Sequence, residues 1–405
     1  MDVLFLAPAY PPDMQQFTRG LTEVGARVWG VGDTPPDQLP GSLRRRLTGY
    51  LHVPRILDED DVIRRVETWL GGRRPDRVEG LWEVVTTLAA RLRERLGVPG
   101  MQPSVVAGFR DKQLMKERVG AAGLRAPRSR RASTVGEIRE AARALGFPLV
   151  VKPTAGAGSM DTFKVQDAPA LEQALLATAH VPEVVVEEFV EGQEYTFETL
   201  CVAGRPVFTS VSIYHPNTLI ARQNEWISPI ILTLRDPQAA PVRAGSRLGH
   251  GVLQALEMGS GFTHMEWFLN GSGEAVFGEV ACRSPGASMV DLMNYANDID
   301  LFVEWARVVC HGHFEADLRR PWNAAVIFKR ASGHGRIRHI VGMDEFRRRH
   351  GKWIARADLL PVGAPRRDWK ATFLSDGNLV VRHPDLDTCT ALAQEAADTI
   401  RMYAG

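Results

Sequence analysis

The chain has 405 residues, of which 44% are hydrophobic and 24% are charged, and its formal net charge at pH 7 is +1. This length exceeds what one compact core usually contains, so we expect two or three packed units. The near-zero charge argues against nucleic acid or a membrane surface as a partner, and no apolar run is long enough to cross a bilayer.

The beginning of the chain reads as a buried strand and not as an export signal, because residues 1–8 lack a basic segment and prolines follow after a few apolar residues. The cysteines are far apart and form no CxxC pair, which favours packed thiols in a reducing compartment over a disulfide or zinc framework. We therefore expect a globular, cytoplasmic protein. The four cysteines are Cys201, Cys282, Cys310 and Cys389.

The first hundred residues alternate apolar, strand-like runs with helical stretches. This alternation predicts an α/β unit with a parallel sheet over residues 1–104. The loop after the first run, residues 8–12, has no GxGxxG motif, so we do not expect a dinucleotide to bind there. The alternating segments are residues 3–7, 14–24, 26–31, 60–69 and 84–96.

The middle of the chain, residues 105–313, reads as α+β, and its smaller lobe is expected over about 118–190. The β-branched runs over 184–207 predict an antiparallel meander. The Asn270–Gly273 turn predicts a hairpin over 262–281, because two strand-like runs flank it directly. Further expected elements are a buried strand over 147–153 and helices over 244–258 and 300–311.

Two further stretches have a less regular pattern. Residues 212–226 are polar and aromatic without a clear period, which is typical of a mobile substrate loop, and Arg222 is an additional candidate cation there. Residues 314–405 again mix strand and turn signals, so we expect a small C-terminal α+β unit.

The first candidate for chemistry is Lys152 with the small-residue loop that follows it. Glycines let backbone N–H groups approach a phosphate closely, and the lysine adds a positive charge. The lysine precedes the loop, so this is not a Walker A motif, and an ordinary turn after a strand would give the same pattern. The loop residues that could contact phosphate are Gly156, Gly158 and Ser159.

The second candidate is the acidic stretch 187–194, at the end of an apolar run. Its backbone could hydrogen-bond the edge of an adenine while a carboxylate holds ribose hydroxyls, although an acidic surface loop would look similar. The third is the pair Glu266 and Glu279, one on each arm of the predicted hairpin, with Arg283 four residues later. Paired carboxylates can ligate Mg²⁺ ions that bridge phosphates. The alternative interpretation is that the two carboxylates are solvated side chains on exposed strands and bind no metal.

The order of these three motifs, with Lys112 before them, resembles the ATP-grasp superfamily over residues 105–313 and, more loosely, over the whole chain. The resemblance implies an N-terminal pre-ATP-grasp unit followed by a two-lobed ATP-grasp fold with adenine between the lobes. It also implies ATP as the nucleotide and Mg²⁺, with Mn²⁺ as an alternative, as the metal.

The resemblance assigns roles to individual residues. Lys112 and Lys152 look like the phosphate-binding lysines, and Glu194 looks like the ribose carboxylate. Glu266 and Glu279 resemble the metal ligands, and Arg283, with Lys152, is the candidate catalytic residue that holds the substrate or the acyl phosphate. The hinge that contacts adenine is identified with Glu187, Glu188, Phe189 and Val190.

One residue departs from the pattern of many family members, which have Asn two residues after the second metal-binding Glu. This chain has Ala281 there, and alanine cannot ligate a metal. The pattern around Ala281 is similar to the amino-acid ligase and biotin-carboxylase-like branches. His264 lies two residues before Glu266, on the same strand face, and could point toward the phosphates or the substrate.

The resemblance implies an ATP-dependent ligase that activates a carboxylate as an acyl phosphate and joins it to an amine, releasing ADP. A biotin-carboxylase-like or purine-synthesis enzyme, or a nucleotide-binding module without turnover, is the alternative. The expected partners are a small carboxylate and a small amine, without nucleic acid or membrane, and the sequence leaves a homodimer open.

Overall fold

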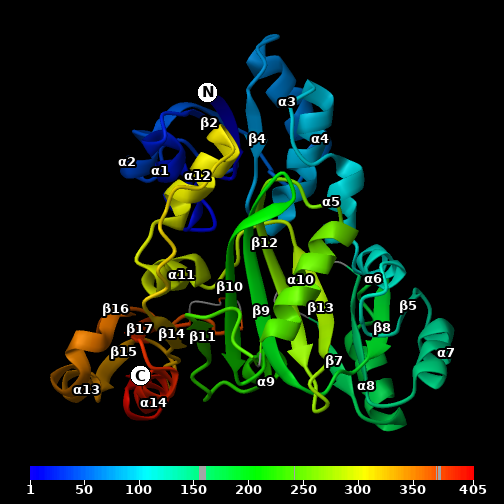
Figure 1. The fold of residues 1–405 in the computed structure, drawn as a ribbon, viewed down its shortest axis with the longest axis vertical. Helices are drawn as coiled ribbons and strands as arrows, with labels where there is room; N and C mark the ends of the chain where they lie inside the picture. Colours follow the sequence, from blue (N-terminus) through cyan, green and yellow to red (C-terminus); the bar gives the residue numbers. More distant parts are fainter. Residues whose placement is uncertain (155–160, 241, 371, 373–374) are drawn as a thin grey trace.

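The computed structural model describes residues 1–154, 161–240, 242–370, 372 and 375–405. The residues of the expected phosphate loop, Gly156, Gly158 and Ser159, lie outside the described part. Figure 1 shows a parallel sheet at the N-terminal end, a small sheet flanked by α7 and α8, and a long sheet that joins both to the C-terminal end of the chain. The mixed α/β and α+β fold class expected from the sequence is confirmed.

The N-terminal unit is a four-stranded parallel sheet of order β3-β2-β1-β4, as the alternating pattern predicted. Helix α3 begins after Asp58, whose side chain accepts a hydrogen bond from the Asp61 amide, and ends at Gly71 in the left-handed conformation. The elements of this unit are β1 (Asp2–Leu6), α1 (Met14–Glu23), β2 (Arg27–Gly32), α2 (Gly41–Arg44), β3 (Leu47–His52), α3 (Glu59–Leu70), β4 (Arg77–Glu79), a 3₁₀ turn (Glu83–Val85) and α4 (Thr86–Leu96).

A second, antiparallel sheet of order β5-β8-β6-β7 forms the smaller lobe. Helix α7 begins with a capping box between Thr134 and Glu137. The elements here are α5 (Pro103–Arg110), α6 (Lys112–Ala121), β5 (Ser129–Ala132), α7 (Val135–Leu145), β6 (Leu149–Pro153), β7 (Phe163–Val165), α8 (Ala168–Ala177) and β8 (Val184–Glu188).

The largest sheet has eight antiparallel strands in the order β13-β12-β9-β10-β11-β14-β17-β16. It therefore extends without interruption from the predicted hairpin into residues 314–405. Its elements are β9 (Gln193–Val202), β10 (Arg205–His215), α9 (Thr218–Gln223), β11 (Ile230–Leu234), α10 (Arg243–Ala255), β12 (Gly261–Leu269), β13 (Ala275–Ala281), α11 (Met289–Asn297), α12 (Leu301–His311), β14 (Asn323–Phe328), β16 (Ile354–Leu359) and β17 (Gly377–His383).

In the rest of the C-terminal unit, helix α14 packs against strands β14 and β17 of this sheet. Strands β15 and β18 form a separate antiparallel pair. None of the helices in the described part of the chain is both long and apolar enough to cross a membrane. The remaining elements are β15 (Ile337–Val341), α13 (Met343–His350), a 3₁₀ turn (Gly351–Trp353), α14 (Leu386–Thr399) and β18 (Arg401–Ala404).

Two sequence-based expectations are wrong. Residues 184–207 do not form one meander, because β8 pairs with β5 and β6 in the small sheet while β9 and β10 pair in the large one. Residues 212–226 are not a loop throughout, because β10 continues to His215 and Thr218–Gln223 forms α9. In both cases the partner strands and side chains come from distant parts of the sequence, so local patterns did not reveal them.

An apolar core joins the N-terminal unit to the large sheet. The Phe17 ring of α1 meets Phe302 and Trp305 of α12 edge-on, with ring centroids 4.9 and 5.1 Å away. A Cβ added at Gly20 would lie 2.2 Å from the Phe302 carbonyl oxygen, so glycine allows α1 and α12 to pack this closely. This packing fixes the N-terminal unit over one end of the hairpin β12–β13.

Candidate active site

Two adjoining cavities lie on one face of the hairpin β12–β13. The larger cavity, of about 210 Å³, lies between this hairpin and the smaller lobe, and the smaller cavity, of about 170 Å³, lies between the hairpin and the N-terminal unit. Both are lined by Lys112, Glu266 and Glu279, which therefore form their common wall. Three of the residues predicted from distant motifs thus come together at one point.

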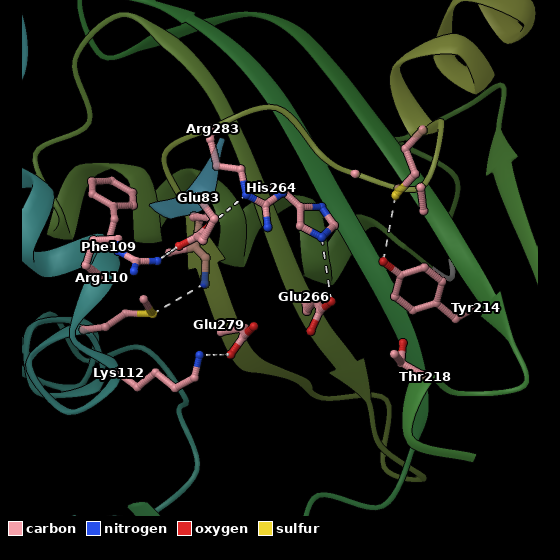
Figure 2. A pocket seen from close by; sticks show the side chains of 16 residues that line it. Glu83, Phe109, Arg110, Lys112, Tyr214, Thr218, His264, Glu266, Glu279 and Arg283 are labelled. Atoms are coloured by element: carbon pink, nitrogen blue, oxygen red, sulfur yellow. Dashed lines mark hydrogen bonds and ion pairs between the residues drawn. The ribbon is translucent and has the colours of Figure 1, made fainter. Parts of the chain in front are cut away.

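The hairpin aligns the two carboxylates. Glu266 on β12 lies directly opposite Glu279 on β13, and the register shifts just after Glu266. Because directly opposite residues share a face of an antiparallel sheet, both side chains extend to the same side. Figure 2 shows them projecting toward the cavity, with Lys112 next to Glu279.

Helix α6 supplies Lys112 at its first position. The Asp111 side chain accepts hydrogen bonds from the amides of Gln113 and Leu114, which fixes the start of the helix. The Lys112 Nζ then lies 2.9 Å from Glu279 Oε2. Burial tends to lower the pKa of Lys112, but Glu279 outweighs this effect and raises it, so the ammonium stays charged.

Lys152, near the end of β6, lines the larger cavity and belongs to a buried cluster of charged side chains. Its Nζ lies 2.7 Å from Glu187 Oε1, and Lys116 of α6 forms an ion pair with the other oxygen of Glu187. Burial lowers the pKa of Lys152 to about 8, although Glu279 acts in the opposite direction. Burial, together with Lys152, also lowers the pKa of Lys116 well below its ordinary value.

Glu279 is the counter-charge for these lysines. Burial tends to raise the pKa of Glu279, but Lys112 and Lys152 outweigh burial and lower it to about 2. Glu279 is therefore a carboxylate at any ordinary pH. A cavity with two lysines and two carboxylates on one wall suits a ligand that combines phosphates with a hard cation.

The expected hinge residues line the larger cavity. Glu187, Glu188, Phe189 and Val190 all do so, but the side chains of the two glutamates are directed to other protein groups. Glu188 Oε1 accepts from Arg125 Nη2 at 2.5 Å, and Lys164 Nζ lies 3.8 Å from the centre of the Phe189 ring. Contact with an adenine through this segment would therefore use the backbone more than the carboxylates.

Glu194, the expected ribose carboxylate, is buried at the start of β9 and also lines the larger cavity. Its Oε2 accepts a hydrogen bond from the Thr218 amide at 2.6 Å. Burial, together with the nearby Glu266 carboxylate, raises the pKa of Glu194 to about 8. Without a ligand, Glu194 is therefore mostly protonated at neutral pH.

The smaller cavity contains a cluster that sequence reasoning missed. Arg283 Nε lies 2.6 Å from Glu83 Oε2, and Arg110 of α5 forms an ion pair with the other oxygen of Glu83. Burial tends to raise the pKa of Glu83, but the two arginines outweigh it and lower the pKa. No local motif marks Glu83 or Arg110, because their proximity to Arg283 depends on how the N-terminal unit packs.

His264 lines the smaller cavity next to the carboxylates. Its Nδ1 lies 3.0 Å from Oε1 of the buried Glu198, and its Nε2 lies 3.7 Å from Glu266 Oε1. Burial tends to lower the pKa of His264, but Glu198 and Glu266 outweigh it and raise it to about 9. Ala281 lies directly opposite His264, so the imidazole borders the place where many family members have Asn.

The metal-binding capacity of this wall can be judged from its donors. Within the described ranges, no three His, Cys, Asp or Glu side chains are close enough to hold a metal ion by themselves. Two opposed carboxylates that border both cavities nevertheless fit Mg²⁺, which usually takes one or two carboxylates and completes its shell with water and phosphate oxygens. The residues fit a metal that binds together with a nucleotide.

The central part of the chain matches a known protein family. Residues 117–294 match the family model of the ATP-grasp domain. This segment, less than half of the chain, therefore resembles an ATP-grasp domain. The motifs that suggested the superfamily, from Lys152 to Arg283, lie inside the matched segment, and the resemblance inferred from them is confirmed.

Known proteins that resemble this chain include ligases. The chain is 26% identical over 218 residues to an L-arginine-specific L-amino acid ligase of Bacillus subtilis, and this alignment covers 52% of this chain and 52% of that protein. The chain is 39% identical over 110 residues to a D-alanine–D-alanine ligase of Delftia acidovorans, and this alignment covers 26% of this chain and 34% of that protein. The matches thus span about half, or less, of these curated relatives.

Solved structures resemble the fold along its whole length. The crystal structure of an L-amino acid ligase from Bacillus licheniformis superimposes with a TM-score of 0.79 at 20% identity, covering 100% of this chain and 99% of that one. An N5-carboxyaminoimidazole ribonucleotide synthetase from Thermotoga maritima gives a TM-score of 0.71 at 17% identity, covering 100% and 99%. At these identities the likeness establishes the fold alone.

Proposed function

We propose that the protein is an ATP-dependent ligase that converts a carboxylate into an acyl phosphate and passes the acyl group to an amine, releasing ADP and phosphate. The observation that carries this proposal is the common wall of the two cavities, made of Lys112, Glu266 and Glu279. A phosphate at this wall would border a second substrate in the smaller cavity, as transfer between two bound molecules requires.

In this proposal the larger cavity holds ATP. Lys112 and Lys152 neutralise its phosphates, the backbone around Glu188 and Val190 meets the adenine, and Glu194 meets the ribose. The side chains of both lysines are only 12% exposed, which supports these roles, because a charge–charge interaction is stronger where water is largely excluded. Mg²⁺ or Mn²⁺ bound by Glu266 and Glu279 would add further neutralisation of the phosphate charge.

The smaller cavity holds the acid and the amine. A carboxylate oxygen of the acid attacks the γ-phosphorus, and the bond from phosphorus to the ADP oxygen breaks. The amine nitrogen then attacks the acyl carbon, loses a proton, and phosphate leaves. Arg283 holds the negative oxygens of the acid or the acyl phosphate, and Glu83 fixes the direction of the guanidinium at 2.6 Å.

The class of substrate follows from the relatives and from the wall of the smaller cavity. Both curated relatives described above are named as ligases of amino acids. The cavity combines the charged Glu83, Arg110 and Arg283 with apolar surface from Phe109 and Met289. Charged and apolar walls together suit small zwitterions with apolar side chains, so we propose amino acids as the acid and the amine.

The activation step can be tested with hydroxylamine. Each candidate amino acid is incubated with ATP, Mg²⁺ and hydroxylamine, which replaces the natural amine because it is small and strongly nucleophilic. The proposal expects a hydroxamate and ADP in equal amounts. AMP and pyrophosphate would instead indicate an acyl adenylate and overturn the mechanism, and ADP without any hydroxamate would favour a kinase or a carboxylase that uses bicarbonate.

A further inference from the structure

The C-terminal unit contributes no side chain to either cavity among the described lining residues, the last of which is Met289. It nevertheless contacts the wall of the larger cavity through α9, the helix Thr218–Gln223. Leu219, Ile220 and Gln223 of this helix line the larger cavity together with the lysines. The support of α9 therefore bears on the shape of the proposed nucleotide site.

Helix α9 is too short to be stable by itself. It has six residues, and isolated helices shorter than about 12–15 residues are marginal in water. It also buries little surface, because Ala221 is its one buried residue and Ile220 is 48% exposed. Hydrogen bonds to the rest of the protein must therefore hold it in place.

The first end of α9 is held by the large sheet. The Thr218 amide donates to Glu194 Oε2 at 2.6 Å, and the side chain of Asn217 accepts from the Glu194 amide at 3.2 Å and donates to the Gly192 carbonyl at 2.9 Å. These contacts join the helix to the start of β9, beside the expected ribose carboxylate. These hydrogen bonds to β9 do not reach the last turn of α9.

The last turn of α9 is held by Arg330, which follows β14. Its Nη1 donates to the carbonyl oxygens of Ala221 at 2.9 Å and Asn224 at 2.7 Å. The carbonyls at the end of a helix lack partners within the helix, so a cation there satisfies them and complements the helix dipole. The guanidinium carbon also lies 4.6 Å from the centre of the Trp369 ring, which holds the planar group in place.

Two further contacts join the same pair of segments. Arg222 Nη1 donates to the Lys370 carbonyl at 3.0 Å, and Arg366 forms an ion pair with Glu225, just after the helix. The supporting segments are themselves tied together, because the fully buried Asp376 accepts from the Ala331 amide at 2.8 Å and from the Arg367 amide at 2.7 Å. The segments that support α9 are therefore joined to one another by hydrogen bonds.

We infer that Arg330 is a positioning residue of the nucleotide site, acting through α9 from outside the cavity. This inference rests on the proposed function, because it takes the larger cavity as the place of ATP. Loss of Arg330 should free the last turn of α9 and loosen the wall at Leu219, Ile220 and Gln223. The bound nucleotide should then be held more weakly, while the residues of the common wall stay in place.

The test compares Arg330→Gln with the matched control Arg336→Gln in the full chain. Arg336 is also an arginine of the C-terminal unit that donates to a backbone carbonyl, that of Gly363 at 2.7 Å, but it does not contact α9. Binding of ADP with Mg²⁺ is measured by titration calorimetry, and amide hydrogen exchange is followed in residues 218–225. We expect the dissociation constant to rise about ten-fold, and exchange to accelerate in this segment, in Arg330→Gln alone.

The outcomes separate the inference from the proposed function. If the parent protein does not bind ADP, the proposed function fails. If the parent binds ADP and Arg330→Gln binds it equally well, or if α9 exchanges at the parent rate, the inference is wrong. Should Arg330→Gln melt well below the parent, Trp369→Leu serves as the milder variant, because it removes the ring contact and keeps both hydrogen bonds. It should weaken ADP binding less than Arg330→Gln, and unchanged binding together with unchanged exchange in α9 would count against the inference.

Discussion

The two cavities share a wall but are built differently. The larger cavity takes most of its charged residues from short segments that carry their own pattern, such as Lys152 at the end of β6 and Glu187 and Glu188 in β8. The smaller cavity gathers Glu83, Arg110 and His264 from three units with no common motif. In the proposed function, the nucleotide site would therefore depend on local segments and the substrate site on how the units are packed.

The largest effect should come from Lys152→Ala, which tests the larger cavity. Removing a buried cation that faces phosphates should cost about 2–4 kcal/mol of transition-state stabilisation, without emptying an apolar core. Glu187 keeps its ion pair with Lys116, so the fold should survive. Phosphate release at saturating substrates measures the loss. The control is Lys352→Ala, because Lys352 is exposed and lines neither cavity. A parent-like rate in Lys152→Ala would refute the phosphate assignment.

Glu279→Gln tests the common wall, on which both cavities depend. The substitution keeps the shape of the side chain but removes one negative ligand, so the Mg²⁺ concentration for half-maximal activity should rise about ten-fold or more, the equivalent of at least about 1.4 kcal/mol. Mn²⁺ binding followed by electron paramagnetic resonance gives a second measurement that does not depend on turnover.

The control for the common wall is Glu274→Gln. Glu274 lies in the turn of the same hairpin and lines neither cavity. Its replacement should leave the magnesium dependence unchanged. An equal shift in both variants would mean that the hairpin as a whole, and not the carboxylate of Glu279, sets the metal requirement.

Glu83→Gln tests the smaller cavity alone. The change removes the charge that holds Arg110 and Arg283, so kcat/KM for the acid should fall about 10- to 100-fold, as expected from about 1.5–3 kcal/mol for a charge-assisted hydrogen bond. ADP affinity should stay at the parent value, because Glu83 does not line the larger cavity. The control is Glu304→Gln, because Glu304 is another buried glutamate paired with an arginine. Equal losses of ADP affinity and of kcat/KM would contradict the separation of the two cavities.

The smallest effect is expected in the pH dependence of stability without nucleotide. The pKa of Glu194 is raised from 4.5 to about 8, so its protonated form stabilises the fold below about pH 4.5, and this contribution is lost as the pH rises through about 8. Glu194→Gln cannot titrate and should keep its stability. The melting temperature of the variant should therefore rise relative to that of the parent by several degrees between pH 5 and pH 9. A constant difference would show that Glu194 is already ionised at pH 5.

Elements whose signals are local could be predicted from the amino-acid sequence. The turn Asn270–Gly273 predicted the hairpin, with Glu266 and Glu279 on its two arms, because two strand-like runs flank it directly. The bulge after Glu266, which sets the two carboxylates opposite each other, was not predicted. The alternation of residues 1–104 gave the parallel sheet, since each strand and helix has its own period. Lys152 was recognisable because it ends a buried strand. The roles of these residues as ligands of ATP and metal stay predictions.

Contacts between distant residues depend on how the units pack and could not be predicted from local patterns. Glu83 reaches Arg283 across 200 positions of the chain, and Lys116 of α6 reaches Glu187 of β8. Helix α9 was taken for a loop because six residues carry little pattern, and it is Arg330, more than 100 positions later, that satisfies its last carbonyls. Sequence patterns report the burial of a segment, whereas ion pairs and helix ends are completed by partners that only packing brings within reach.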